Sequence, residues 1–220
     1  MVLTTDRGLD ERVVNRLADQ IAALHDRGLE IVLVTSGAVA AGRYVLGPGS
    51  GTGCMVHKQA ASAVGQSRLM HSYDEAFGRY GKITAQVLLT KDDLRSRERF
   101  LNARNTMCRL LDWRVIPVVN ENDTVAVQEL KLKFGDNDVL SAMVANLVDA
   151  DLLLILSDID GLYTADPHHD PDARLISEVA KIDSGIEKMV KGTAGTLGTG
   201  GMVTKIEAAR LATSSGVSVV

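Results

Sequence analysis

The stretch "VIPVVNENDTVAV", residues 115–127, decides the fold class, because it joins an apolar run directly to a polar one. Its first five residues are mostly β-branched and lack the alternation of a half-exposed strand, which predicts a strand buried on both faces. Four further runs of this kind occupy residues 31–34, 83–89, 152–156 and 217–220. Stretches of helical period separate the runs, and this order is typical of an α/β fold with a mainly parallel sheet.

Five helices are predicted from the stretches around these runs. The first has Asp10 as its N-cap and ends at Gly28. Its predicted apolar stripe consists of Val13, Leu17, Ile21 and Leu24. The other four helices cover residues 58–77, 95–111, 138–148 and 202–214.

Residues 125–134, "VAVQELKLKF", follow a different pattern, because apolar and polar residues alternate there with period two. This alternation predicts a solvent-facing β-hairpin beside the sheet, which can cover a ligand. No low-complexity linker or internal repeat divides the sequence. We therefore expect residues 1–220 to form a single domain.

Composition narrows the classes of function. The chain has 220 residues, 45% of them hydrophobic and 24% charged, which is the balance of an ordinary globular protein. Its net charge is −4, and three Phe, four Tyr and one Trp are few for stacking bases, so nucleic acid is not an expected partner. The sequence has neither an apolar run of membrane-spanning length nor a signal-peptide core, and its two cysteines make no disulfide framework. We expect a soluble, cytoplasmic protein with small ligands and no membrane partner.

Polar residues follow four of the predicted strands. They are Thr35-Ser36, Thr90-Lys91-Asp92, Asn120-Glu121-Asn122-Asp123 and Ser157-Asp158-Ile159-Asp160. A turn or a helix cap explains each group taken alone. The carboxyl ends of parallel strands meet at one edge of a sheet, however, and ligands bind there. Four such groups together therefore indicate a ligand site.

Two segments at predicted helix starts add detail to this site. "GDND", residues 135–138, can cap a helix, but its two carboxylates flanking an amide can also orient cations or hold Mg²⁺ through water. "GTGGMVTK", residues 198–205, places glycines and threonines before a helix with Lys205 in its first turn. Backbone N–H groups and a lysine at that point form a phosphate cradle, with a plain surface loop as the alternative. The residues alone predict a phosphate-binding α/β domain that also holds a small polar ligand.

Eight segments, in order, resemble the amino acid kinase family. They are "VTSGAVAAG" (34–42), "KQAASAVGQSRLM" (58–70), "AQVLLTKDDL" (85–94), "RERFLNARNT" (97–106), "VIPVVNENDTVAV" (115–127), "FGDNDVLSA" (134–142), "LSDIDGLYTADP" (156–167) and "GTGGMVTK" (198–205). The resemblance implies a three-layer α/β sandwich with a mainly parallel central sheet. Within the family, the first and fifth segments resemble the members that phosphorylate the side-chain carboxylate of L-glutamate with ATP, the first step of proline biosynthesis. Kinases acting on acetylglutamate or aspartate are the alternatives.

The resemblance also implies roles for individual residues. Glutamate is expected at Ser36, Asp123 and Asn137, and the adenosine part of ATP near Ser157 and Asp158. The phosphates are expected at Thr199, Gly200, Gly201, Met202, Val203, Thr204 and Lys205. Asp138 is expected to organise lysines around the transferred phosphoryl group, and Lys205 to neutralise its charge. Mg²⁺ is expected to bridge phosphate oxygens, with no dedicated metal site on the protein. The acceptor is already a carboxylate, so catalysis needs positioning and charge stabilisation rather than a general base.

The sequence departs from the family pattern in three places. Family members begin with a further strand that carries a Lys-x-Gly-Ser type turn beside the phosphates, and this sequence starts after that point. It stops at Val220, before the last strands and before the PUA domain of many bacterial members. Residues 128–138 also form a slightly longer approach to the Asp-Asn-Asp motif. We expect the 220-residue chain to keep much of the fold and to be a poor catalyst, with a catalytically silent binding or regulatory module as the alternative. The resemblance further implies a homo-oligomer, a dimer or a tetramer, and inhibition by proline.

Overall fold

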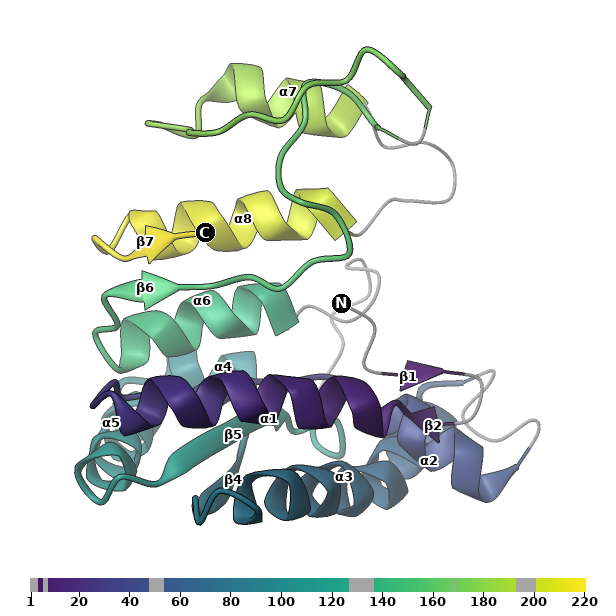
Figure 1. The fold of residues 1–220 in the computed structure, drawn as a ribbon, viewed down its shortest axis with the longest axis vertical. Coiled ribbons are helices and arrows are strands. Elements are labelled where there is room, and N and C mark those ends of the chain that lie inside the picture. The colour runs from purple at the N-terminus through teal and green to yellow at the C-terminus, as the bar shows by residue number, and fades with distance from the viewer. Residues whose placement is uncertain (1–3, 6–7, 48–53, 127–136, 168, 193–200) are drawn as a thin grey trace. The chain divides into compact units, whose positions relative to one another are not determined.

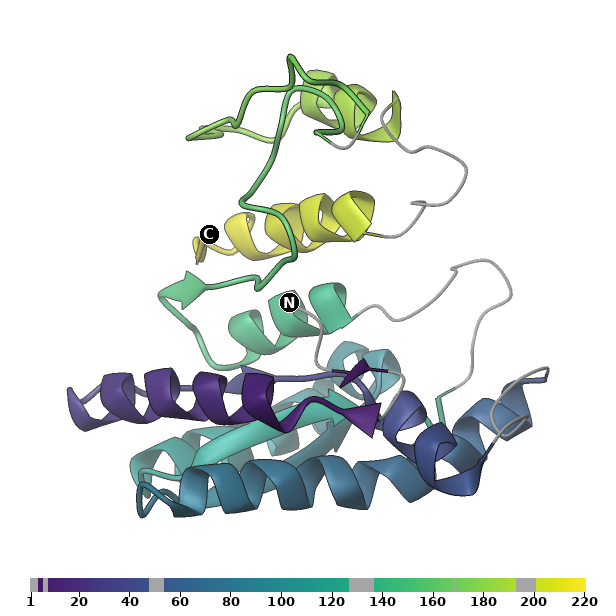
Figure 2. The ribbon, with the colours of Figure 1, turned by 45° about the vertical axis from the view of Figure 1, so that its right-hand side comes forward.

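A computed structural model describes residues 4–5, 8–47, 54–126, 137–167, 169–192 and 201–220. The chain divides into two compact units, which we call the N-terminal unit (residues 2–130) and the C-terminal unit (residues 131–220, with Met1). Figures 1 and 2 show the elements of each unit as a ribbon. The expectation of a single domain stays a prediction.

A parallel three-stranded sheet forms the centre of the N-terminal unit. Its strand order is β3 (Leu33–Val34), β5 (Ile116–Glu121) and β4 (Thr84–Leu89). Figure 1 labels β4 and β5. The middle strand is the most deeply buried, with Ile116, Val118 and Val119 at 0% exposure. The predicted strands at residues 83–89 and 115–119 are confirmed, and the one at residues 31–34 is shorter than predicted.

The described residues of this unit form five helices. They are α1 (Glu11–Asp26), α2 (Ala38–Leu46), α3 (Met55–Gly78), α4 (Lys91–Arg95) and α5 (Arg97–Asp112). A short antiparallel pair, β1 (Thr4–Thr5) and β2 (Gly8–Leu9), precedes them. Where one helix was predicted over residues 95–111, the structure has a break at Ser96, whose backbone is extended and separates α4 from α5.

The first helix begins and ends as predicted. The Asp10 carboxylate accepts a hydrogen bond from the Arg12 backbone N–H at 3.0 Å, and Gly28 has a positive φ of 96°. The predicted apolar stripe is partly wrong, because Leu24 is 36% exposed. The buried face consists of Val14, Leu17, Ala18, Ile21, Ala22 and His25. Small alanines and a histidine form much of this face, so the largest apolar residues alone did not define it.

The second and third helices pack with their backbones in close contact. A Cβ atom added to Gly65 would lie 1.8 Å from the carbonyl oxygen of Ala38, and one added to Gly42 would lie 1.8 Å from that of Ala61. Any side chain at either glycine would therefore push the two helices apart. α2 was not predicted, because Gly37 precedes it without a side-chain cap.

The side chain of Arg114 ties the end of α1 to the loop before β5. Its guanidinium donates hydrogen bonds to the backbone carbonyls of His25, Gly28 and Leu29. These carbonyls lie at and just beyond the C-terminal end of α1, where helical partners are missing. The cation is also favourable at this negative end of the helix dipole.

Within the described part of the C-terminal unit, there are two short parallel strands and three helices. They are α6 (Asn137–Leu147), β6 (Leu152–Leu153), α7 (Ser184–Gly192), α8 (Gly201–Thr213) and β7 (Ser218–Val219). The strand register pairs Leu152 with Ser218, so both strands lie where predicted but are shorter. A small core consists of Ala142, Ala145, Leu153, Ala208, Ala212 and Val217.

Two further observations concern the whole chain. Most of the predicted hairpin, residues 127–134, lies outside the described residues, and Val125 and Ala126 form a turn against the carbonyl of Asn122. Among the described residues, no helix combines the length and the apolar character needed to cross a membrane.

Candidate active site

Polar residues that follow the three strands of the N-terminal unit meet at one edge of its sheet. The register pairs Val34 with Val119, and Leu89 with Glu121. Asn120 and Glu121 are the last residues of β5, and the segments that begin at Thr35, Thr90 and Asn122 leave the sheet side by side. The predicted gathering of polar residues is confirmed for these three strands, and the fourth group, at Ser157, belongs to the C-terminal unit.

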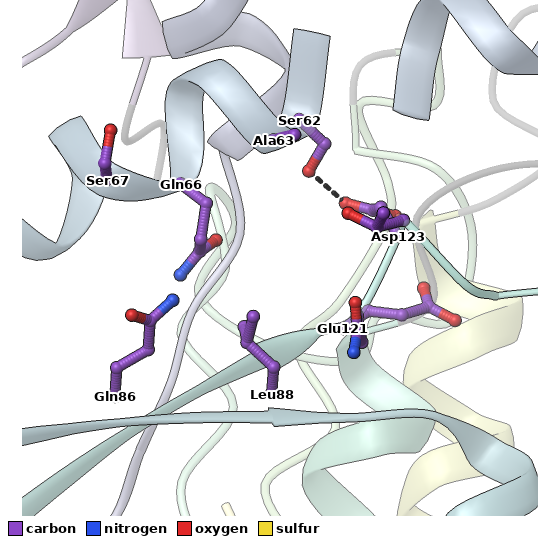
Figure 3. Close-up of a pocket in the computed structure, with 10 residues that line it drawn as sticks. Ser62, Ala63, Gln66, Ser67, Gln86, Leu88, Glu121 and Asp123 are labelled. Carbon is purple, nitrogen blue, oxygen red and sulfur yellow. Dashed lines mark hydrogen bonds between the residues drawn. The ribbon is translucent and has the colours of Figure 1, made fainter. Parts of the chain in front are cut away.

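A cavity of about 270 Å³ opens at this edge (Figure 3). Its lining comes from α3, β4, the last residue of β5 and the segment that follows, and consists of Ser62, Ala63, Gln66, Ser67, Gln86, Leu88, Glu121, Asn122, Asp123 and Thr124. The Ser62 hydroxyl donates a hydrogen bond to Oδ2 of Asp123 at 2.5 Å. Because Ser62 is only 3% exposed, this bond holds the carboxylate in a fixed orientation at the cavity wall.

A buried amide pair lies one helical turn further along α3. Nδ2 of Asn120 donates to Oε1 of Gln66 at 2.8 Å, and Oδ1 of Asn120 accepts from the Glu121 backbone N–H at 2.9 Å. The sequence analysis did not single out Ser62 or Gln66 as site residues. A signal was present, because both are polar and lie four residues apart on the face of α3 that is buried.

The structure places Ser36 directly after β3, with an exposed side chain. Of these two residues that were expected to bind glutamate, Asp123 lines the described cavity and Ser36 does not. The preceding residue is firmly held, because the hydroxyl groups of Thr35 and Tyr73 are hydrogen-bonded at 2.8 Å in the core. Burial raises the pKa of Tyr73 above its usual value, although the Thr35 hydrogen bond opposes this shift. The phenol is therefore neutral at physiological pH.

A second polar cluster lies in the C-terminal unit, between the first turns of α6 and α8. Oδ2 of Asp138 accepts a hydrogen bond from Thr204 Oγ1 at 2.8 Å and one from Lys205 Nζ at 3.1 Å. The side chains of Lys205 and Asp138 are 22% and 24% exposed, so solvent and small ligands can reach the pair. The structure thus brings together the two residues that were expected to be catalytic.

The other residues expected at the site lie at the starts of α6 and α8, at residues 157–158, or outside the described residues. Asn137 begins α6, and Gly201, Met202 and Val203 form the start of α8. Ser157 Oγ donates to Oδ1 of the neighbouring Asp158 at 3.3 Å. Thr199, Gly200, Gly135 and Asp136 lie outside the described residues. Of the three residues expected to bind glutamate, Ser36 and Asp123 belong to the N-terminal unit, and Asn137 belongs to the C-terminal unit.

Comparison with known protein families identifies the family of the chain. A model of the amino acid kinase family matches residues 2–220. The chain belongs to the amino acid kinase family. As an amino acid kinase it shares its fold with the isopentenyl phosphate kinase of T. acidophilum, at a TM-score of 0.56 and 18% identity, over 95% of this chain and 84% of that one. The predicted α/β fold class is thereby confirmed.

Curated relatives of this amino acid kinase are far more similar in sequence. The chain is 56% identical over 216 residues to a glutamate 5-kinase of Oleidesulfovibrio alaskensis, covering 98% of this chain and 56% of the relative. It is 54% identical over 220 residues to a glutamate 5-kinase of Citrifermentans bemidjiense, covering 100% of this chain and 58% of the relative. For a glutamate 5-kinase of Dehalococcoides mccartyi the identity is 56% over 213 residues, 96% of this chain and 57% of that one. The chain thus spans a little more than half the length of these relatives.

Proposed function

We propose that this amino acid kinase chain is part of a glutamate 5-kinase, which transfers the γ-phosphoryl group of ATP to the side-chain carboxylate of L-glutamate. The product would be L-glutamyl 5-phosphate, and the reaction would open proline biosynthesis. The observation that carries this proposal is an identity of 53–56% to curated glutamate 5-kinases over almost the whole chain. A small polar cavity with a fixed carboxylate supports it, because an amino acid carries an ammonium group that such a carboxylate binds.

The acceptor is proposed to bind at the edge of the N-terminal sheet. Asp123 would accept hydrogen bonds from the ammonium group of glutamate. The bond from Ser62 to its Oδ2 holds the carboxylate in place for this contact. Ser36 and Asn137 are proposed as further glutamate contacts. The side-chain carboxylate of glutamate attacks as an anion, so no residue has to remove a proton from it.

The phosphoryl donor is proposed to bind at the cluster of Asp138, Thr204 and Lys205. Lys205 would neutralise the charge that develops on the transferred phosphoryl group, and Asp138 would hold the lysine in place through its hydrogen bond of 3.1 Å. Residues 199–204 would surround the phosphates, where the backbone N–H groups at the start of α8 favour anions. Ser157 and Asp158 are proposed near the adenosine.

Mg²⁺ supplies charge neutralisation between phosphate oxygens when it is bound with ATP. Both side-chain hydrogen bonds described for Asp138 go to Oδ2, so its Oδ1 is suited to such a cation or to its water ligands. We further propose action in the cytoplasm, assembly into a dimer or tetramer, and inhibition by proline. These three proposals rest on the family resemblance.

Hydroxylamine trapping of acyl phosphates tests the proposal directly. The full-length protein is incubated with ATP, Mg²⁺ and one of three acceptors: L-glutamate, N-acetyl-L-glutamate or L-aspartate. We expect a hydroxamate from L-glutamate and none above background from the other two. A preference for another acceptor would reassign the substrate. Nucleotide binding without any hydroxamate would favour a silent binding module.

A further inference from the structure

Gln66 has a buried amide group of which only one end is bonded within the cavity wall. Its side chain is 7% exposed, and its Oε1 accepts the hydrogen bond from Asn120. Among the residues that the structure describes, no atom accepts a hydrogen bond from Nε2 of Gln66. A buried donor without an acceptor costs folding free energy, and such groups are rare enough to require an explanation.

The orientation of this amide follows from its neighbours. The Glu121 backbone N–H is a donor, so the Asn120 atom that accepts from it, at 2.9 Å, must be Oδ1. Nδ2 of Asn120 therefore points to Gln66 and needs an acceptor there. Only Oε1 of Gln66 can accept, which leaves Nε2 as the outward donor. Two consecutive amides are thus fixed by one backbone N–H, and rotating either amide would place two donors or two acceptors together.

The free donor belongs to a cavity that also offers an acceptor. In Figure 3 the amides of Gln66 and Gln86 point toward one another, and Asp123 lies with Ser62 at another part of the same lining. Ser62 and Gln66 are four residues apart on α3, so the fixed carboxylate and the free amide donor are about one helical turn apart. Gln86 is exposed, so its amide can turn its own carbonyl oxygen toward Gln66 when no ligand is bound and can move aside when one binds. A ligand that carries a cation and an anion close together matches this pair.

We propose that Nε2 of Gln66 donates a hydrogen bond to the α-carboxylate of the amino-acid substrate, while Asp123 binds its ammonium group. This inference rests on the proposed function and deepens it. The α-carboxylate and the ammonium group share one carbon atom, so two neighbouring side chains can bind both. The side-chain carboxylate then takes no part in this contact and is left for phosphoryl transfer. Gln66 would in this way distinguish the two carboxylates of glutamate.

The variant Gln66→Glu in the full-length protein isolates the donor. The carboxylate introduced at position 66 keeps one oxygen to accept from Asn120. Its second oxygen takes the place of Nε2 and would repel the α-carboxylate of the substrate. We expect the KM for L-glutamate to rise by about 10-fold or more, with kcat and the KM for ATP close to the wild-type values, because a hydrogen bond to a charged group is lost. Gln20→Glu, on the exposed face of α1, is the matched control and should change none of these values.

Binding measurements keep the inference testable if Gln66→Glu does not fold. Gln66→Met, which has similar length and no donor, then replaces it, and thermal stabilisation by L-glutamate is compared with that by 4-aminobutyrate, which lacks the α-carboxylate. We expect the wild type to bind 4-aminobutyrate more weakly than L-glutamate. The loss of affinity should be about as large as the loss that Gln66→Met causes in binding of L-glutamate. An unchanged KM for L-glutamate in a folded Gln66 variant, or equal binding of both ligands by the wild type, would overturn the inference. If the wild type itself forms no hydroxamate from L-glutamate, the proposed function has failed instead.

Discussion

Lys205 reaches Asp138 from the first turn of α8, and the two side chains remain partly accessible. At the proposed phosphoryl-donor site, a preorganised cation here would stabilise the transition state more than bound ATP. We expect Lys205→Ala to lower kcat by about 100-fold or more, with a smaller change in the KM for ATP. Steady-state kinetics of the full-length protein check this, with the exposed Lys181→Ala as the control. Near-normal kcat with a raised KM for ATP would show that the lysine only holds the nucleotide.

Asp123 is the second residue with a specific expected effect. Its carboxylate is fixed by Ser62 at the cavity wall, so its loss leaves the proposed ammonium group without its charged partner. We expect Asp123→Ala to raise the KM for L-glutamate by at least about 30-fold, since removing one member of such a pair costs about 2 kcal/mol or more. The KM for ATP should change little. Asp112→Ala, at an exposed position at the end of α5, is the control. A wild-type KM for glutamate in Asp123→Ala would refute the assignment.

His25 makes the stability of the fold depend on pH. Burial, together with the charges of Arg114 and Lys82, lowers the pKa of His25 below its usual value of 6.5, against a smaller effect of Asp26. As pH falls through 6.5, the unfolded chain binds a proton at this residue before the folded chain does, so the folded state loses stability. We expect the free energy of unfolding in urea to be lower at pH 5.5 than at pH 7.5. His25→Gln should show a smaller difference, and an equal difference in both proteins would contradict this role.

The site residues differ in how far the sequence could predict them. Asp123, Asp138 and Lys205 stand in motifs at strand ends and helix starts, where the family resemblance assigns them. Ser62 and Gln66 lie in the middle of a long helix, where their spacing of four residues indicates a shared face but not that this face meets β5. Their partners become known only when α3 and β5 are packed together, so their function depends on tertiary structure.

At the scale of elements, the contact between α2 and α3 depends on Gly65. A Cβ atom there would overlap a main-chain oxygen at 1.8 Å, so the two helices would have to separate. We expect Gly65→Ala to lower the free energy of unfolding by about 1–3 kcal/mol or more. Gly78→Ala is the control on the same helix, because its Cβ would meet no atom within 4 Å. Urea unfolding of both variants measures this change. An equal decrease in the free energy of unfolding in both variants would rule out the helix contact as the cause.

The predicted elements were correct where the chain carries a strong local signal. Long apolar runs gave β4 to within one residue and β5 to within two residues at either end, and the cap at Asp10 gave the start of α1. α7 had a signal that was overlooked, because Asp183 accepts hydrogen bonds from the backbone N–H groups of Gly185 and Ile186 at its start. The same two bonds lower the pKa of Asp183. The break at Ser96 carried only the weak signal of its residue type, since Ser is a common N-cap but its side chain makes no cap hydrogen bond with α5.

At the scale of the whole molecule, the two proposed ligands should protect different parts of the chain from hydrogen exchange. L-glutamate alone should slow amide exchange in residues 62–67 and 121–124, the two segments that supply most of the cavity lining in the N-terminal unit. ATP with Mg²⁺ should slow exchange in residues 137–142 and 201–206 of the C-terminal unit. Hydrogen exchange read by mass spectrometry measures both. Because Asn137 is also a proposed glutamate contact, the discriminating segment is residues 201–206, and its protection by glutamate alone would contradict the proposed division.

The glycines of α2 and α3 also decide how this protein can evolve. The atoms that would meet a new side chain at Gly42 or Gly65 are carbonyl oxygens of Ala61 and Ala38, and every amino acid carries such an oxygen. No second substitution at Ala38 or Ala61 can remove the obstruction. In a search for suppressors, most damaging core changes yield compensating partners that restore volume, but these two positions should yield none in the facing residues. Lineages that lose either glycine would have to reset the spacing of both helices or regain the original codon.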